Sequence, residues 1–184
     1  MKPQTLSTKL VFNGSIFDVR TDRIREGELE YSRDIVVHKG SAVIVPVFDD
    51  GTVALVRQYR HAAGIFMLEV PAGSLEIDED PLTGAIRELE EEVGVVAENV
   101  ELITEFYVSP GSSSERISVF WGKLGKRVAE GGGKKSENEN IRLVRMTAAE
   151  AYQALDEGKF QDAKTIIALL KAKALMQNKQ RPNA

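Results

Sequence analysis

Residues 73–95, GSLEIDEDPLTGAIRELEEEVGV, predict a helix whose two ends and apolar face are specified by its own sequence. Asp80 and Pro81 are typical of a helix start, because a carboxylate caps free N–H groups and proline has no N–H to leave unpaired there. Gly94 is typical of a helix end, since glycine adopts the left-handed conformation at low cost. At about 100° per residue, one narrow apolar face is expected to pack on a core. Its members are Leu82, Ile86, Leu89 and Val93.

The same helix would place the carboxylates of Glu88, Glu91 and Glu92 within an arc of about 100°. Like charges this close raise one another's pKa values unless a cation lies between them. A hard divalent ion accepts such oxygen ligands, and Mg²⁺ suits an all-carboxylate site best, with Mn²⁺ as a substitute. A solvated acidic helix face is the alternative interpretation of an isolated run of glutamates.

The spacing of the whole stretch follows one pattern: Gly73, five residues, Glu79, seven residues, and then REL-EEE-VGV at 87–95. It resembles the Nudix box, the signature of hydrolases that cleave nucleoside diphosphates linked to another group. Because the arginine and both glycines are in register, the resemblance favours a metal site over a solvated acidic face. It implies that Glu88 and Glu92 bind Mg²⁺ directly, that Glu91 assists, and that the backbone carbonyl of Ala72 completes the set. An Arg87–Glu79 pair would support the loop before the helix.

The fold class implied by the resemblance is α/β: a Nudix fold, an α/β/α sandwich with a mixed sheet, preceded by a small N-terminal antiparallel sheet. Strand patterns at residues 9–19 and 28–38, joined by a charged connection at 21–27, predict that N-terminal sheet. Further strands are expected at 41–48, 52–59, 67–70, 100–107, 117–124 and 141–146, and closing helices at 148–157 and 162–177. We expect residues 1–39 to form a dimerisation subdomain and 40–184 the hydrolase domain.

Charge and composition narrow the functional classes. The chain has 24 Lys and Arg against 28 Asp and Glu, which argues against nucleic-acid binding because that requires a basic surface. No apolar run approaches the roughly 20 residues of a membrane helix, and the first residues lack a secretory segment. We therefore expect a cytoplasmic protein with no membrane partner. An anionic substrate would be held locally, by a metal ion and a few arginines.

Three further segments are similar to the ADP-ribose pyrophosphatase and nucleoside-diphosphate-sugar hydrolase branch: RQYR at 57–60, YVSPG at 107–111 with SER at 114–116, and ENENI at 137–141. The resemblance implies Mg²⁺-dependent hydrolysis of ADP-ribose to AMP and ribose 5-phosphate. GDP-mannose or a broad range of nucleoside diphosphate sugars is the alternative substrate, and a non-catalytic nucleotide-sugar sensor is a less favoured function. RNA decapping or oxidised-nucleotide clean-up would call for a basic groove or a compact domain without the N-terminal sheet.

Site residues outside the box follow from this resemblance and from side-chain chemistry. Glu137 matches the position of the general base on an acidic loop, with Glu139 as the fallback and a box glutamate such as Glu91 as the other source. Arg57 and Arg60 offer planar forks that match phosphate oxygens. Glu69 and Glu115 are candidates to accept hydrogen bonds from sugar hydroxyls.

The N-terminal sheet has a second implied use. In the branch that the chain resembles, this sheet packs between two subunits, so we expect a homodimer. Arg20 or Arg33 would then contact a nucleotide across a two-fold interface.

Overall fold

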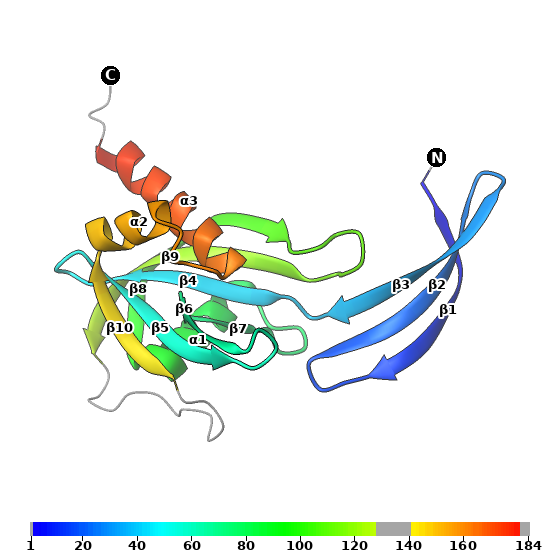
Figure 1. The fold of residues 1–184 in the computed structure, drawn as a ribbon, viewed down its shortest axis with the longest axis horizontal. Coiled ribbons are helices and arrows are strands. Elements are labelled where there is room, and N and C mark those ends of the chain that lie inside the picture. Colours follow the sequence, from blue (N-terminus) through cyan, green and yellow to red (C-terminus); the bar gives the residue numbers. More distant parts are fainter. Residues whose placement is uncertain (1, 128–140, 181–184) are drawn as a thin grey trace.

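The computed structural model describes residues 2–127 and 141–180, which form two sheets and three helices. An antiparallel sheet of order β1-β2-β3 (Gln4–Asn13, Phe17–Glu26, Leu29–His38) projects from the rest of the chain as an arm (Figure 1). A seven-stranded sheet forms the body, with order β10-β5-β4-β9-β8 and two short strands at its side, β6 on β5 and β7 on β4. Its β4–β9 pair is parallel and the other pairs are antiparallel, so the sheet is mixed as expected.

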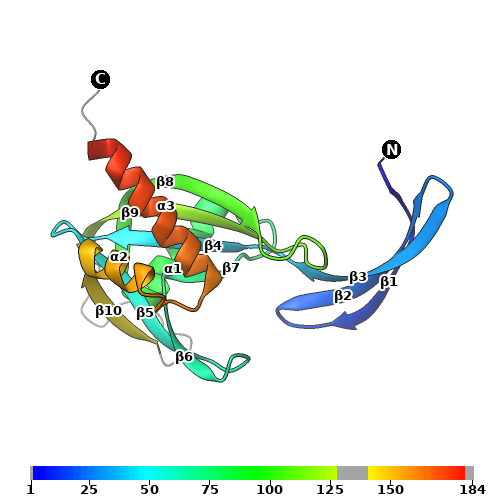
Figure 2. The same ribbon diagram turned by 45° about the horizontal axis from the view of Figure 1, so that its top comes forward.

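The elements of the body have the following bounds: β4 Ser41–Val47, β5 Thr52–Arg60, β6 Ile65–Glu69, β7 Ala72–Ser74, α1 Pro81–Val93, β8 Val95–Tyr107, β9 Arg116–Arg127, β10 Arg142–Thr147, α2 Ala148–Asp156 and α3 Ala163–Gln180. Helices α2 and α3 lie together on one side of the sheet and α1 lies on the other (Figures 1 and 2). Among the described residues, none of these helices combines the length and apolarity that crossing a bilayer requires.

Strand β4 shows how the two layers are built. Val43 and Val45 pack in a core with residues of α2 and α3, whereas Ala42 and Ile44 pack in a second core with residues of α1. Successive side chains of a strand point to opposite faces, so a fully buried run with no polar position serves both layers. The α/β/α sandwich expected from the sequence is confirmed.

Helix α1 begins and ends where its sequence predicts. The Asp80 side chain accepts hydrogen bonds from the backbone N–H groups of Leu82 (3.0 Å) and Thr83 (3.2 Å). Gly94 ends the helix in the left-handed conformation, with φ of 74°. The prediction of the buried face is partly wrong. Leu82 is 37% exposed, whereas Gly84 and Ala85, which were not predicted, are buried together with Leu89 and Val93.

The small antiparallel sheet expected at the N-terminus is confirmed, but it has three strands, and residues 9–19 do not form a single strand of it. Gly14 makes a turn by donating its N–H to the Phe17 carbonyl (3.2 Å), and the charged residues 21–26, expected in a connection, belong to β2. Charged side chains are stable in this strand because they pair with neighbours: Arg23 and Arg25 both reach Glu30 on β3, and Thr8 on β1 donates to Asp22.

The arm is joined to the body by hydrogen bonds as well as by the chain. The loop between β8 and β9 lies along β3, where the Val36 N–H donates to the Ser112 carbonyl (2.8 Å) and the Ser114 N–H donates to the Val36 carbonyl (2.9 Å). The position of the arm is therefore coupled to the loop that leads into β9.

We predict that Asp80→Ala lowers the free energy of unfolding by about 1 kcal/mol, because the first turn of α1 loses its cap. Urea denaturation followed by circular dichroism measures the change. Glu90→Ala is the control, since its side chain is exposed on the same helix and should change the value by less than about 0.5 kcal/mol. An equal loss in both variants would show that the cap has no special role.

Candidate active site

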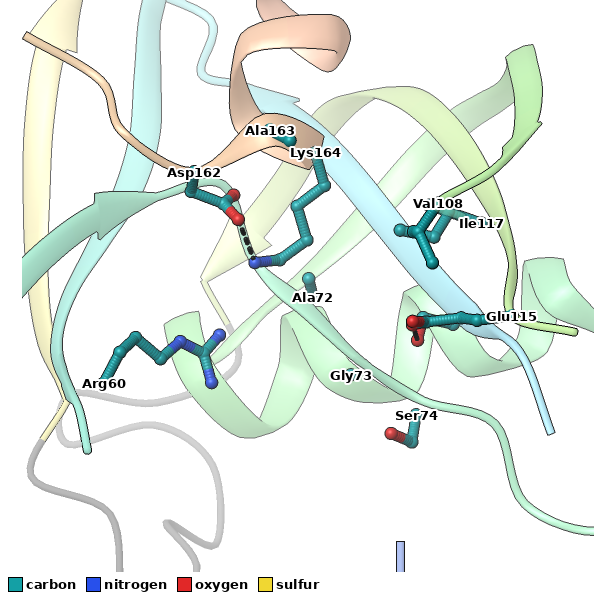
Figure 3. A pocket seen from close by; sticks show the side chains of 11 residues that line it. Arg60, Ala72, Gly73, Ser74, Val108, Glu115, Ile117, Asp162, Ala163 and Lys164 are labelled. Atoms are coloured by element: carbon teal, nitrogen blue, oxygen red, sulfur yellow. Dashed lines mark hydrogen bonds and ion pairs between the residues drawn. The ribbon is translucent and has the colours of Figure 1, made fainter. Parts of the chain in front are cut away.

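A cavity of about 340 Å³ opens where β7, the start of β9 and the start of α3 meet (Figure 3). Three of the residues predicted from the sequence line it: Arg60, Ala72 and Glu115. The remaining lining residues are Ser41, Gly73, Ser74, Val108, Ile117, Asp162, Ala163 and Lys164.

Two glutamates of α1 lie directly against the backbone of β7. Glu92 Oε2 accepts a hydrogen bond from the Ala72 N–H (3.2 Å). A Cβ atom on Gly73 would lie 1.9 Å from Glu88 Oε1, so only glycine leaves room for this carboxylate. Glu88 and Glu92 are one helical turn apart and therefore share a face of α1. The structure places both beside β7, the strand that contains Ala72, whose carbonyl the resemblance implies as a ligand.

Arg87 holds the loop before α1 against the helix. Its Nε and Nη2 donate to the two carboxylate oxygens of Glu79 (2.9 and 3.0 Å), which confirms the expected pair. These hydrogen bonds raise the pKa of Arg87 and lower that of Glu79. The Nη1 atom also donates to Glu88 (2.7 Å) and lies 3.5 Å from Glu91. One guanidinium thus partly neutralises three carboxylates.

The three-carboxylate cluster expected from the sequence is not assembled in the described part of the chain. No group of three or more His, Cys, Asp and Glu side chains there is gathered closely enough to hold a metal ion. Glu88 and Glu91 are both paired with Arg87 here, whereas Glu92 accepts a hydrogen bond from the Ala72 N–H. The donor set nevertheless fits a hard divalent cation, because the two carboxylates of Glu88 and Glu92 supply oxygen ligands and both pack against the backbone of β7.

Glu69 lies behind the cavity, fully buried, and is bound by two cations. Arg60 donates from Nε and Nη2 to its two oxygens (both 2.7 Å), and Lys164 Nζ bonds to the same carboxylate. Burial alone would raise the pKa of Glu69, but these hydrogen bonds and charges outweigh it and lower the pKa. The expectation that Glu69 accepts hydrogen bonds from sugar hydroxyls does not agree with this burial. Glu69 instead fixes Arg60 at the cavity wall.

Lys164 and Asp162 are cavity residues that the sequence analysis did not single out. Asp162 caps α3 by accepting hydrogen bonds from Thr165 N–H (2.9 Å) and Oγ1 (2.6 Å), and it also accepts one from Lys164 Nζ (2.8 Å). These two residues were missed because a polar segment just before an apolar helix usually only caps the helix and is exposed to solvent. The missed signal is Glu69 itself, because a charge within the apolar segment 67–70 requires a buried cation from elsewhere.

Glu115 reaches the cavity from the loop before β9. Its Oε1 accepts a hydrogen bond from Ser41 Oγ (2.7 Å) and lies 3.9 Å from His38 Nδ1. His38 Nδ1 itself accepts the Gly40 N–H (3.0 Å). The Glu115 carboxylate is thereby held beside the junction between the arm and the body.

The other predicted residues lie elsewhere. The Arg57 guanidinium stacks on the Phe66 ring (4.1 Å) and is not part of the cavity lining. Arg20 and Arg33 line a separate cavity of about 570 Å³ between the arm and the loop before β9 of the same chain, together with Tyr107. Glu137 and Glu139 lie outside the described residues.

Comparison with known proteins agrees with this architecture. A protein 34% identical over 167 residues, 90% of each chain, is the "Methanol dehydrogenase activator" of Bacillus methanolicus. The "ADP-ribose pyrophosphatase" of Bacillus subtilis (strain 168) is 32% identical over 170 residues, covering 92% of this chain and 91% of its own. The crystal structure of an "ADP compounds hydrolase" has the same fold, with a TM-score of 0.82 at 21% identity over 99% of this chain and 98% of the other.

The family model for the NUDIX domain matches residues 38–169, which span α1, both of its glutamates at β7 and most of the cavity. From this match and from the two relatives aligned along almost their full lengths, the chain belongs to the NUDIX family.

Proposed function

We propose that the protein hydrolyses the pyrophosphate bond of a nucleoside diphosphate sugar, with ADP-ribose as substrate and AMP and ribose 5-phosphate as products. One observation carries the proposal: Glu88 and Glu92 lie against β7 at the edge of a cavity into which Arg60 projects. A cation held by carboxylates and a guanidinium both stabilise the negative charge of phosphoryl oxygens during pyrophosphate hydrolysis. Relatives named as ADP-ribose pyrophosphatases, at 32% and 37% identity, support the choice of substrate.

The metal ion of the proposed reaction is Mg²⁺. Glu88, Glu92 and the carbonyl of Ala72 would hold it. Arg87 would orient Glu88 and Glu91 through its hydrogen bonds to their carboxylates. When bound, such an ion neutralises phosphoryl oxygens and lowers the pKa of a water molecule. Gly73 contributes by its lack of a side chain, because any Cβ atom would displace the Glu88 carboxylate.

Arg60 binds the substrate phosphates in this proposal. A guanidinium has five N–H donors, and Glu69 engages two of them. Arg60 lines the cavity, and the bidentate pair with buried Glu69 keeps the fork in place. Glu115 accepts hydrogen bonds from substrate hydroxyls at the other side of the cavity. Arg57, which stacks on Phe66, is left with no proposed contact.

The general base is assigned by resemblance to Glu137, with Glu139 and Glu91 as alternatives. Such a base accepts the proton of the water that attacks phosphorus, and it needs to reach that water within about 3 Å. Glu91 is the member of this set within the described residues, and its side chain is 45% exposed with Arg87 as its contact.

Initial rates with ADP-ribose, GDP-mannose and UDP-glucose, measured side by side, test the proposed function. ADP-ribose is expected to give the highest kcat/KM, and removal of divalent ions with EDTA should abolish turnover until Mg²⁺ is restored. A preference for GDP-mannose would favour the alternative substrate class. Turnover that persists in EDTA would contradict a metal-dependent reaction.

Glu92→Gln should remove most of the activity without unfolding the chain. The variant removes one ligand charge from a partly exposed helix surface, and losing a direct ligand to a catalytic cation costs several kcal/mol of transition-state stabilisation, roughly 10²-fold or more in kcat. Glu90→Gln on the same helix is the matched control and should keep normal turnover. Activity of Glu92→Gln within threefold of the wild type at saturating Mg²⁺ would refute the ligand assignment.

The proposal extends to a homodimer formed through the arm. Large apolar side chains are exposed along the arm: Leu10, Val11, Phe12, Ile16, Phe17 and Leu29. Apolar surface of this kind on a projecting sheet is stabilised when a second copy covers it. A partner bound there would also approach Arg20 and Arg33, which line the cavity beside the arm.

Leu10→Glu should separate the dimer, because the new carboxylate would be buried without a cation at the interface. Light scattering at micromolar concentration is expected to give twice the chain mass of 20.3 kDa for the wild type and 20.3 kDa for the variant. Lys9→Glu, an exposed neighbour that is already charged, should remain dimeric. A wild-type mass of 20.3 kDa with full activity would argue against this assembly.

A further inference from the structure

Lys164 brings a second cation to the cavity. It is the second residue of α3, and its Nζ bonds to the Glu69 carboxylate and to Asp162 Oδ1 (2.8 Å). Its side chain is 16% exposed and is part of the cavity lining. Figure 3 shows Lys164 extending from α3 toward Ala72, while the Arg60 guanidinium points into the same space.

The ammonium group keeps hydrogen-bonding capacity for a ligand. Lysine has three N–H donors, and within the described part of the chain two of them are used, by Glu69 and by Asp162. Lys164 can therefore bind an oxygen atom in the cavity without breaking either bond. The two acceptors also fix the direction of the side chain, so little conformational entropy is lost when a ligand binds.

Glu69 does not need Lys164 in order to have both oxygens hydrogen-bonded. The bidentate pair with Arg60 already supplies one donor to each oxygen and balances the charge. Lys164 adds a positive charge beside the Arg60–Glu69 ion pair. The carboxylate of Asp162, at the start of α3, balances this charge. Two cations, Arg60 and Lys164, are thus held by Glu69 and Asp162 at a cavity that β7 also lines.

We propose that Lys164 is a substrate-binding residue that donates a hydrogen bond to a phosphoryl oxygen of the nucleoside diphosphate sugar. Lysine is a common phosphate ligand that acts as a point charge, beside the planar fork that Arg60 offers. In this inference Glu69 is a positioning residue, because it sets the separation of Lys164 and Arg60 without touching the substrate. The inference rests on the proposed function.

Lys164→Met tests the proposal, since it removes the charge and keeps an apolar stem of similar length. KM for ADP-ribose should rise about tenfold or more, with kcat changed less than about threefold, the pattern of a lost binding contact. Lys164→Arg should recover most of the loss. Lys173→Met is the matched control: Lys173 lies on the same helix and pairs with Asp156, away from the cavity lining, so KM should not change.

Titration of metal-free protein with inorganic pyrophosphate separates this inference from the proposed function, because it requires no turnover. The Kd for pyrophosphate should rise about tenfold in Lys164→Met, whether or not the wild type hydrolyses ADP-ribose. If KM and Kd stay within twofold of the wild type while Tm falls, Lys164 only clamps α3 to β6 and the proposal is overturned.

If Lys164→Met fails to fold, a second measurement, made on the wild-type protein, tests the proposal. The ¹⁵N resonance of the Lys164 ammonium group should shift when pyrophosphate is added, and that of Lys173 should not. Equal shifts of both resonances, or no shift at Lys164, would overturn the proposal.

Discussion

The close approach of the Glu88 and Glu92 carboxylates to the backbone of β7 is the contact on which the rest of the site depends. It requires Gly73, whose missing side chain leaves room for Glu88, and a helix that begins at the Asp80 cap so that both glutamates face the strand. Arg87 then anchors the preceding loop through Glu79 and reaches Glu88 with the same guanidinium. The small, acidic and basic side chains of residues 73–95 therefore form one packed unit.

Local signals in the sequence, together with the resemblance to the Nudix box, predicted the ends of α1 and the loop before it. The cap at Asp80, the left-handed Gly94 and the Arg87–Glu79 pair all lie within one short stretch, and the buried strand β4 is marked by its uninterrupted apolar run. Pairings between distant residues could not be predicted in this way. Glu69 and Lys164 are 95 positions apart, so the strand pattern shows a glutamate without the cation that neutralises it.

The arm shows the same limit in a different form. Segment 21–27 has the composition of a loop, yet its residues 21–26 belong to the central strand β2. The ion pairs to Glu30 and the Thr8–Asp22 hydrogen bond that stabilise this strand exist only once all three strands have assembled. Strand propensity depends on such neighbours. Val36 and His38 connect the arm to the loop that carries Glu115. They likewise gain their contacts from residues far along the chain.

An anomalous difference map from crystals grown with Mn²⁺ is the most direct test of the metal site on α1. We expect a peak about 2.1 Å from carboxylate oxygens of Glu88 and Glu92 and from the carbonyl oxygen of Ala72, with Arg87 still paired to Glu79. A peak at another group of acidic side chains, with Glu88 still bound to Arg87, would contradict the assignment of α1 and β7 as the metal-binding elements.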